Sequence, residues 1–149
     1  MTPHLFLLTP GEWLGEGKIS FSMSPDTIPY YTRWDVQGLE NNEITAVQMV
    51  EMQGAGEALL NQFRFFDLSS SSFNVELSNE MLGVVQGTGL IEPESIAWEF
   101  RNHPTFEGFE VYRRKSTDES TDEYSLHAEY SSPDHHRTIV HGRVWKKVS

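Results

Sequence analysis

The stretch GEWLGEG, residues 11–17, runs directly into KISFSM, residues 18–23, and together they predict the first strand of the fold. This strand begins around Trp13 and contains two more glycines, Gly15 and Gly17. Glycine inside a strand weakens it and is typical of a bend or of a close approach by another part of the backbone. A large indole at the start of such a strand is well placed to close one end of a curled sheet. We therefore expect the remaining strands to return and cover this first one.

The rest of the chain shows the alternation of side-chain character that indicates β-strands. Ile96, Trp98 and Phe100, for example, alternate with small or charged residues. Segments of this kind are separated by turn residues such as Pro, Asn, Asp and Gly. No segment with a helical period is long enough to compete. The expected strands are residues 13–23, 30–36, 44–52, 58–68, 73–77, 84–85, 96–101, 109–114, 124–130 and 138–147.

About ten strands joined by short turns predict an all-β protein, a single antiparallel up-and-down β-barrel, because closure removes the exposed strand edges. A β-sandwich is the alternative. The chain of 149 residues has no internal repeat and no linker, so residues 1–149 are expected to form one domain. The apolar residues 5–8 are expected to cover one end of the barrel.

Composition excludes several classes of function. The net charge is −11, from 22 acidic and 11 basic residues, which disfavours nucleic acid and membranes as partners. There is no cysteine, so no thiolate nucleophile or thiolate metal site is available. No segment looks like a signal peptide or a membrane-spanning helix. We expect a cytoplasmic protein that is a monomer or a homodimer.

The pair Gly11-x-Trp13 on the first strand resembles the short N-terminal motif of the calycin superfamily, which groups lipocalins, fatty-acid-binding proteins and avidins. The resemblance implies that Trp13 closes one end of the barrel. It also implies that a basic residue late in the last strand, here Arg143, packs across the indole. Such a contact is worth roughly 0.5–2 kcal/mol and is structural.

The longer run of residues 11–17 is also similar to the start of nitrobindin-like haem barrels. That resemblance implies a histidine on one of the last strands as the ligand to iron, and His141 is the residue that fits. Ile139, Arg143 and Trp145 share a face with His141, so the prediction requires this whole face to point inward. Haem is thus a possible cofactor under this interpretation.

Polar residues on several strands are candidates for a ligand site. If their faces point inward, they line a cavity and meet a carboxylate or another polar group of a ligand; if not, they face solvent. Barrels of this size are wide enough for one small ligand. The candidate ligand-binding residues are Arg33, Arg64, Trp98, Arg113, His127 and His141.

The leading hypothesis is non-catalytic binding of a small, largely apolar molecule in the barrel. A second is a barrel enzyme, an isomerase or lyase, with Glu99 and Glu129 as a possible acid–base pair. A third is a scaffold that works through its acidic surface. No catalytic motif and no metal-ligand spacing is present, and the Asp134-His135-His136 turn is not expected to hold a metal.

Overall fold

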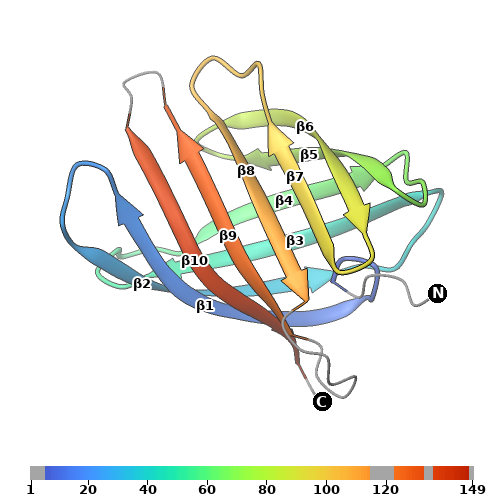
Figure 1. The fold of residues 1–149 in the computed structure, drawn as a ribbon, viewed down its shortest axis with the longest axis horizontal. Helices are drawn as coiled ribbons and strands as arrows, with labels where there is room; N and C mark the ends of the chain where they lie inside the picture. Colours follow the sequence, from blue (N-terminus) through green and yellow to red (C-terminus); the bar gives the residue numbers. More distant parts are fainter. Residues whose placement is uncertain (1–5, 115–122, 133–135, 148–149) are drawn as a thin grey trace.

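A computed structural model shows a closed, all-β, ten-stranded antiparallel barrel (Figure 1). It describes residues 6–114, 123–132 and 136–147. The strands are β1 (Gly11–Phe21), β2 (Thr27–Val36), β3 (Glu43–Met52), β4 (Leu59–Phe66), β5 (Ser72–Asn79), β6 (Gly83–Glu92), β7 (Ser95–Phe100), β8 (Glu107–Arg114), β9 (Glu123–Ser131) and β10 (Arg137–Lys146).

Each strand pairs with its neighbour in sequence, and β1 pairs with β10 to close the ring. Figure 1 shows these first and last strands side by side along their length. The predicted up-and-down barrel is therefore confirmed and the sandwich is excluded. None of the described residues forms a helix that could cross a membrane.

Strand β6 is longer than the two residues expected, because glycines inside it were interpreted as breaks. Gly87 and Gly89 instead lie where the barrel leaves no room for a side chain. A Cβ atom on Gly87 would lie 1.9 Å from the carbonyl oxygen of Glu99, and one on Gly89 would lie 2.1 Å from the ring of Phe73. These glycines mark close approach within a continuous strand.

One end of the barrel is closed by aromatic side chains and by the segment before β1. Trp13 is fully buried, and its indole nitrogen donates a hydrogen bond of 3.2 Å to the carbonyl of Thr9. Phe6 and Leu7 are also buried there, as expected for the described part of residues 5–8. The ring centroid of Phe6 lies 5.2 Å from that of Trp13 and 4.6 Å from that of Tyr112. This end is therefore filled by the protein's own side chains.

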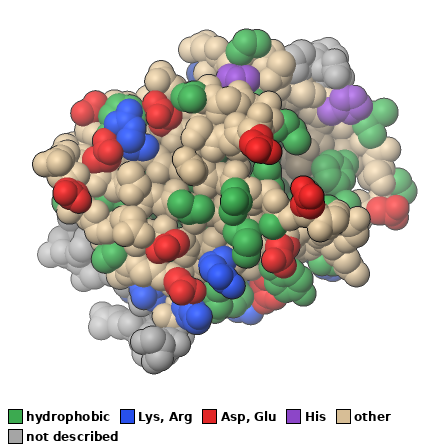
Figure 2. All heavy atoms as spheres, turned by 180° about the vertical axis from the view of Figure 1, so that it is seen from behind, with side chains coloured by type: hydrophobic (Ala, Val, Ile, Leu, Met, Phe, Trp, Pro, Cys, Tyr) green, Lys and Arg blue, Asp and Glu red, His purple; other side chains and the backbone are tan. Residues whose placement is uncertain are grey.

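The outer surface of the barrel is acidic. Figure 2 shows acidic side chains spread among apolar and neutral ones over one face of the molecule. Several carboxylates form ion pairs with arginines across neighbouring strands, as in the pair of Arg64 Nη1 and Glu43 Oε1 at 2.7 Å. These contacts join strands on the outside while the apolar core fills the inside.

Candidate functional site

A cavity of about 300 Å³ occupies the half of the barrel away from Trp13. It opens at the end where β3 connects to β4, β5 to β6 and β7 to β8, since Leu59, Met81 and Phe106 line it there. Met81 is 83% exposed at this mouth. The other lining residues are Ile19, Tyr30, Thr32, Trp34, Gln48, Val50, Met52, Asn61, Phe63, Leu77, Asn79, Leu82, Glu110, Tyr112, Leu126, Tyr130, Thr138, Val140 and Val144.

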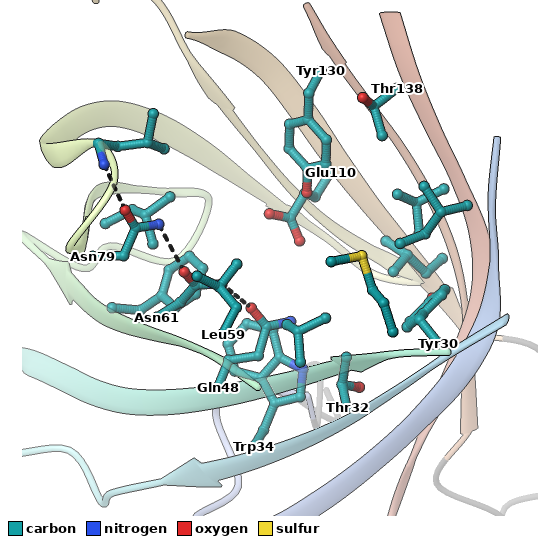
Figure 3. Close-up of a pocket in the computed structure, with 18 of the residues that line it drawn as sticks. Tyr30, Thr32, Trp34, Gln48, Leu59, Asn61, Asn79, Glu110, Tyr130 and Thr138 are labelled. Carbon is teal, nitrogen blue, oxygen red and sulfur yellow. Dashed lines mark hydrogen bonds between the residues drawn. The ribbon is translucent and has the colours of Figure 1, made fainter. Parts of the chain in front are cut away.

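Glu110 places a carboxyl group inside this largely apolar cavity. It alternates with Tyr112 on the inner face of β8, and its Cα partners are Trp98 on β7 and Ala128 on β9. The side chain is only 5% exposed. The hydroxyl of Tyr112 donates a hydrogen bond of 2.6 Å to Glu110 Oε1. The carboxyl group points toward the centre of the cavity (Figure 3).

Burial raises the pKa of Glu110, because a charged carboxylate loses its hydration inside the barrel. Hydrogen bonding by the hydroxyls of Tyr112 and Tyr130 acts in the opposite direction and lowers the pKa. The indole N–H of Trp98 has the same lowering effect, although its geometry is not that of a hydrogen bond. Burial is the largest of these effects, so the neutral acid is favoured.

Three hydroxyl groups of tyrosine surround the same part of the cavity. Burial and the nearby Glu110 raise the pKa values of Tyr112 and Tyr130, which therefore stay protonated. The pKa of Tyr30 is raised by burial and by the charges of Glu110 and Glu16. The Tyr30 hydroxyl is buried and has no hydrogen-bond partner among the described residues. It packs against Gly142 on β10.

An amide ladder forms the opposite wall, on β3, β4 and β5 (Figure 3). Asn61 Nδ2 donates to Gln48 Oε1 at 2.9 Å, and Asn79 Nδ2 donates to Asn61 Oδ1 at 2.9 Å. The backbone N–H of Leu82 donates to Asn79 Oδ1 at 2.7 Å, which links the β5–β6 connection at the mouth to this ladder. The ladder thus ends at the side chain of Gln48 beside the cavity.

The three arginines predicted for the ligand site lie on the outer face of the barrel. Arg33 and Arg113 are exposed, and Arg64 pairs with Glu43 and lies 3.9 Å above the ring of Phe66. They alternate with the buried positions of β2, β4 and β8 and do not line the cavity. The prediction that these arginines face inward and contact a ligand carboxylate is therefore wrong for this cavity.

His127 and His141 also lie on the outer face, as cross-strand partners on β9 and β10. Their Nδ1 atoms are 3.3 Å apart, and His127 Nε2 lies 2.9 Å from Glu129 Oε2. The inner face of β10 instead carries Val140 and Val144. The expected parity of the last strand is therefore wrong, and His141 cannot hold a haem iron inside the barrel. No histidine lines the cavity within the described residues.

Trp98 is the one predicted ligand-binding residue whose side chain points inward. It is buried in the aromatic cluster below the cavity, and its ring centroid lies 5.1 Å from that of Tyr112. It packs behind the residues that line the cavity. Glu99 and Glu129, the acid–base pair of the enzyme hypothesis, are on the outer face. Asp134 and His135 lie outside the described residues.

The predicted stacking of Arg143 on Trp13 is not observed. The guanidinium of Arg143 lies on the outside, 2.6 Å from Glu16 Oε1 and 3.2 Å from Glu123 Oε1. Its central carbon is 4.6 Å from the ring centroid of Trp145. Gly11 begins β1 with φ of 123°, where a Cβ atom would lie 2.7 Å from Lys146 Nζ. Trp13 closes the barrel with Phe6 and Leu7 instead.

Sequence reasoning missed the polar residues that do line the cavity: Tyr30, Gln48, Asn61, Glu110 and Tyr130. On β8, Arg113 was the candidate for the cavity, whereas the barrel buries Glu110 and Tyr112 on the other face of the strand. A glutamate that alternates with a tyrosine is no signal of burial by itself. The register of β8 against its neighbours decides which face of this strand points inward.

Comparisons with known proteins show a shared fold. The chain is similar to the S-type phycobiliprotein lyase CPES from Guillardia theta, with a TM-score of 0.70 and 7% sequence identity over 97% of this chain and 92% of the lyase. EF1p2_mFAP2b bound to DFHBI aligns with a TM-score of 0.46 and 13% identity over 97% of this chain and 98% of that chain. No family model and no curated protein matches the sequence. The ten-stranded antiparallel barrel fits a calycin-like fold.

Proposed function

We propose that this barrel binds a small, largely apolar ligand that enters through the mouth around Met81. The observation that carries the proposal is the cavity, which is lined mainly by apolar side chains and interrupted by a few polar groups, as is usual for ligand sites. The opposite end is filled by Trp13 and Phe6, so space is left at one end only. The proposal treats residues 1–149 as one calycin-type domain.

The size of the cavity limits the ligand. A volume of 300 Å³ equals that of about ten water molecules in the liquid, so the enclosed part of a ligand has roughly ten to fifteen non-hydrogen atoms. A larger molecule would extend through the mouth, so we favour a ligand of about this size.

Filling the cavity tests the proposal. Val140 lines the cavity, and Val140→Trp places an indole in the space that a ligand needs. We expect the wild-type protein to enhance the fluorescence of the neutral probe N-phenyl-1-naphthylamine and the variant to bind it at least about tenfold more weakly. Met52→Trp, nearer the mouth, is a second filled variant in case the first does not fold. Val84→Trp on the exposed face of β6 is the matched control.

Equal binding of the probe by the filled variants and the wild-type protein would contradict the proposal. Native mass spectrometry of the purified protein, followed by extraction, then identifies any small molecule that co-purifies. We expect a bound species in the wild-type protein that is absent from Val140→Trp.

A second candidate function, proton-transfer catalysis on a bound apolar substrate, is favoured by Glu110. A buried carboxyl group with a raised pKa, beside tyrosine hydroxyls, is the type of group that exchanges a proton with a substrate. The test is to incubate the extracted ligand in D₂O with the protein, return its N–H and O–H groups to hydrogen in H₂O, and follow the deuterium that remains bound to carbon by mass spectrometry. Catalysis predicts incorporation that Glu110→Gln abolishes, whereas simple binding predicts none.

A further inference from the structure

The cavity contains a buried acid without a positive partner. Among the described residues that line it there is no lysine, arginine or histidine. The polar groups that face Glu110 are the hydroxyls of Tyr112 on β8, Tyr130 on β9 and Tyr30 on β2, all of which are neutral when protonated. A buried carboxylate without a counter-charge is unfavourable, because its lost hydration is not replaced.

Charges outside the cavity do not supply that partner. Arg143, on the outer face of β10, is engaged by Glu16 and Glu123 on the surface. Glu16 itself adds to the negative potential at Tyr30. The interior is therefore a site that favours positive charge and donated protons, within a molecule whose net charge is −11.

We propose that the ligand presents an amine or another N–H group to Glu110, and that this cavity discriminates against carboxylates such as fatty acids. The inference rests on the proposed function and adds the chemical class of the ligand. An ammonium group takes the place of the carboxyl proton as the partner of Glu110, and that proton leaves to solvent. An anionic head group brought to the same place loses its hydration and meets no positive charge among the described residues that line the cavity.

The surroundings of Glu110 fit such a ligand. Its carboxyl group points into the cavity rather than toward the wall (Figure 3), so a ligand group can reach it. Ile19, Leu126 and Val140 offer apolar surface for a hydrocarbon body. A short apolar chain or ring with one nitrogen group meets each of these features.

Three ligands with the same chain length test the inference: decylamine, decanol and decanoate, measured at pH 7 in about 0.15 M salt by displacement of N-phenyl-1-naphthylamine. The salt weakens non-specific attraction of the amine to the acidic surface. On the wild-type protein we expect decylamine to bind at least about tenfold more tightly than decanol, because the ammonium group and the Glu110 carboxylate form an ion pair. We expect decanoate to bind at least about tenfold more weakly than decanol, because its buried carboxylate has no positive partner. This ranking needs no variant.

Glu110→Gln removes the charge and keeps the shape of the side chain. We expect the affinities of the amine and the alcohol to come within about threefold of each other, since the amide offers no counter-charge. Glu129→Gln on the outer face is the matched control and should keep the wild-type ranking. Val140→Trp should lose all three ligands, whereas amine binding that persists there would be surface binding and would overturn the inference.

The outcomes separate the two proposals. Decanoate bound as tightly as decylamine, or an amine preference that persists in Glu110→Gln, would overturn the inference and leave apolar ligand binding intact. Failure of the probe and of all three ligands to bind the wild-type protein would instead overturn the proposed function.

Discussion

At the scale of single residues, burial in the folded protein raises the pKa of the Glu110 carboxyl group above its ordinary value of 4.5. The unfolded chain does not bury this group, so the pKa differs between the two states. Between that value and the higher pKa in the fold, the folded protein binds more protons than the unfolded chain. The free energy of unfolding therefore falls as pH rises through this window. The same sign applies to any buried acid that lacks a cationic partner.

We predict that the difference in unfolding free energy between wild-type protein and Glu110→Gln decreases as pH rises above 4.5, since glutamine does not titrate. Within the window the slope approaches about 1.4 kcal/mol per pH unit. Urea unfolding of both proteins from pH 4 to pH 8 measures this difference, in which the contributions of the other carboxyl groups cancel. A difference that stays flat with pH would show that Glu110 is not desolvated.

Glu129 serves as a control, because its contribution to stability changes with pH in the opposite direction. Its hydrogen bonds to His127 and Arg137 lower the pKa of its carboxyl group, which is on the outer face. The stability that this group contributes is present above the unfolded-state pKa and is lost as pH falls through the folded-state pKa. The difference between wild-type protein and Glu129→Gln should therefore decrease toward acid.

Gly142 is a second residue with a defined physical role. It faces Gly17 across β1 and β10, and the ring of Tyr30 packs against both. A Cβ atom on Gly142 would lie 2.2 Å from Tyr30 Oη and 2.4 Å from the backbone oxygen of Glu16. The hydroxyl end of Tyr30 can shift a little, but the backbone of β1 cannot.

We predict that Gly142→Ala lowers the free energy of unfolding by about 1–3 kcal/mol through overpacking. Gly56, in the connection between β3 and β4, has no atom within 4 Å of its Cβ position. Gly56→Ala should stay within about 0.5 kcal/mol of the wild-type protein. Chemical denaturation measures both variants, and equal effects would refute the close approach of β1 and β10.

At the scale of elements, the short segment before β1 closes the barrel. Phe6 is fully buried, and its backbone N–H donates to the hydroxyl of Tyr124 at 3.3 Å. Its ring packs edge-on against Trp13 and Trp34. The segment thus replaces the stacked arginine that the resemblance implied. It is distant in sequence from most of the strands that it contacts.

We predict that Phe6→Ala lowers the free energy of unfolding by about 3–5 kcal/mol, as is usual when a buried ring is removed. Binding of N-phenyl-1-naphthylamine to the folded variant should be unchanged, because Phe6 does not line the cavity. Met23→Ala, at a side chain that is 75% exposed, is the control and should lie within about 0.5 kcal/mol of the wild-type protein. Loss of probe binding with little loss of stability would contradict this role.

At the scale of the whole molecule, the chain has 22 acidic and 11 basic residues. Repulsion among the acidic groups destabilises the folded state, and exposed ion pairs such as that of Arg64 and Glu43 offset it only in part. Increasing salt from about 0.01 M to 0.15 M shortens the Debye length from roughly 30 Å to 8 Å. Salt weakens both the repulsion among acidic groups and the ion pairs, so the change in stability with salt shows which of the two is larger.

We predict that this increase in salt at pH 7 raises the free energy of unfolding by about 1 kcal/mol, or Tm by roughly 2–4 °C. Near pH 4.9, where the net charge of the sequence is zero, the effect should vanish. Thermal unfolding in sodium chloride at the two pH values measures it. A decrease in Tm with salt at pH 7 would show that the surface ion pairs outweigh the repulsion.

The sequence by itself determined the fold class and the closing role of Trp13. Strand alternation and turn residues are local signals, and ten such strands in series favour one closed antiparallel ring. The glycines of β1 were also informative, since close approach is the common reason for glycine within a strand. The same reasoning was not applied to β6, where Gly87 and Gly89 also mark close approach but were interpreted as breaks in the strand.

Only the tertiary structure decided which face of each strand points inward. The outer faces of β8 and β10 carry Phe109, Ile139 and Trp145, so apolar character does not mark the interior. Closure sets the register that brings Glu110 opposite Trp98 and sends His141 outside. The physical reason is the two-residue period of a strand, in which both faces are equally regular and a shift by one residue exchanges them.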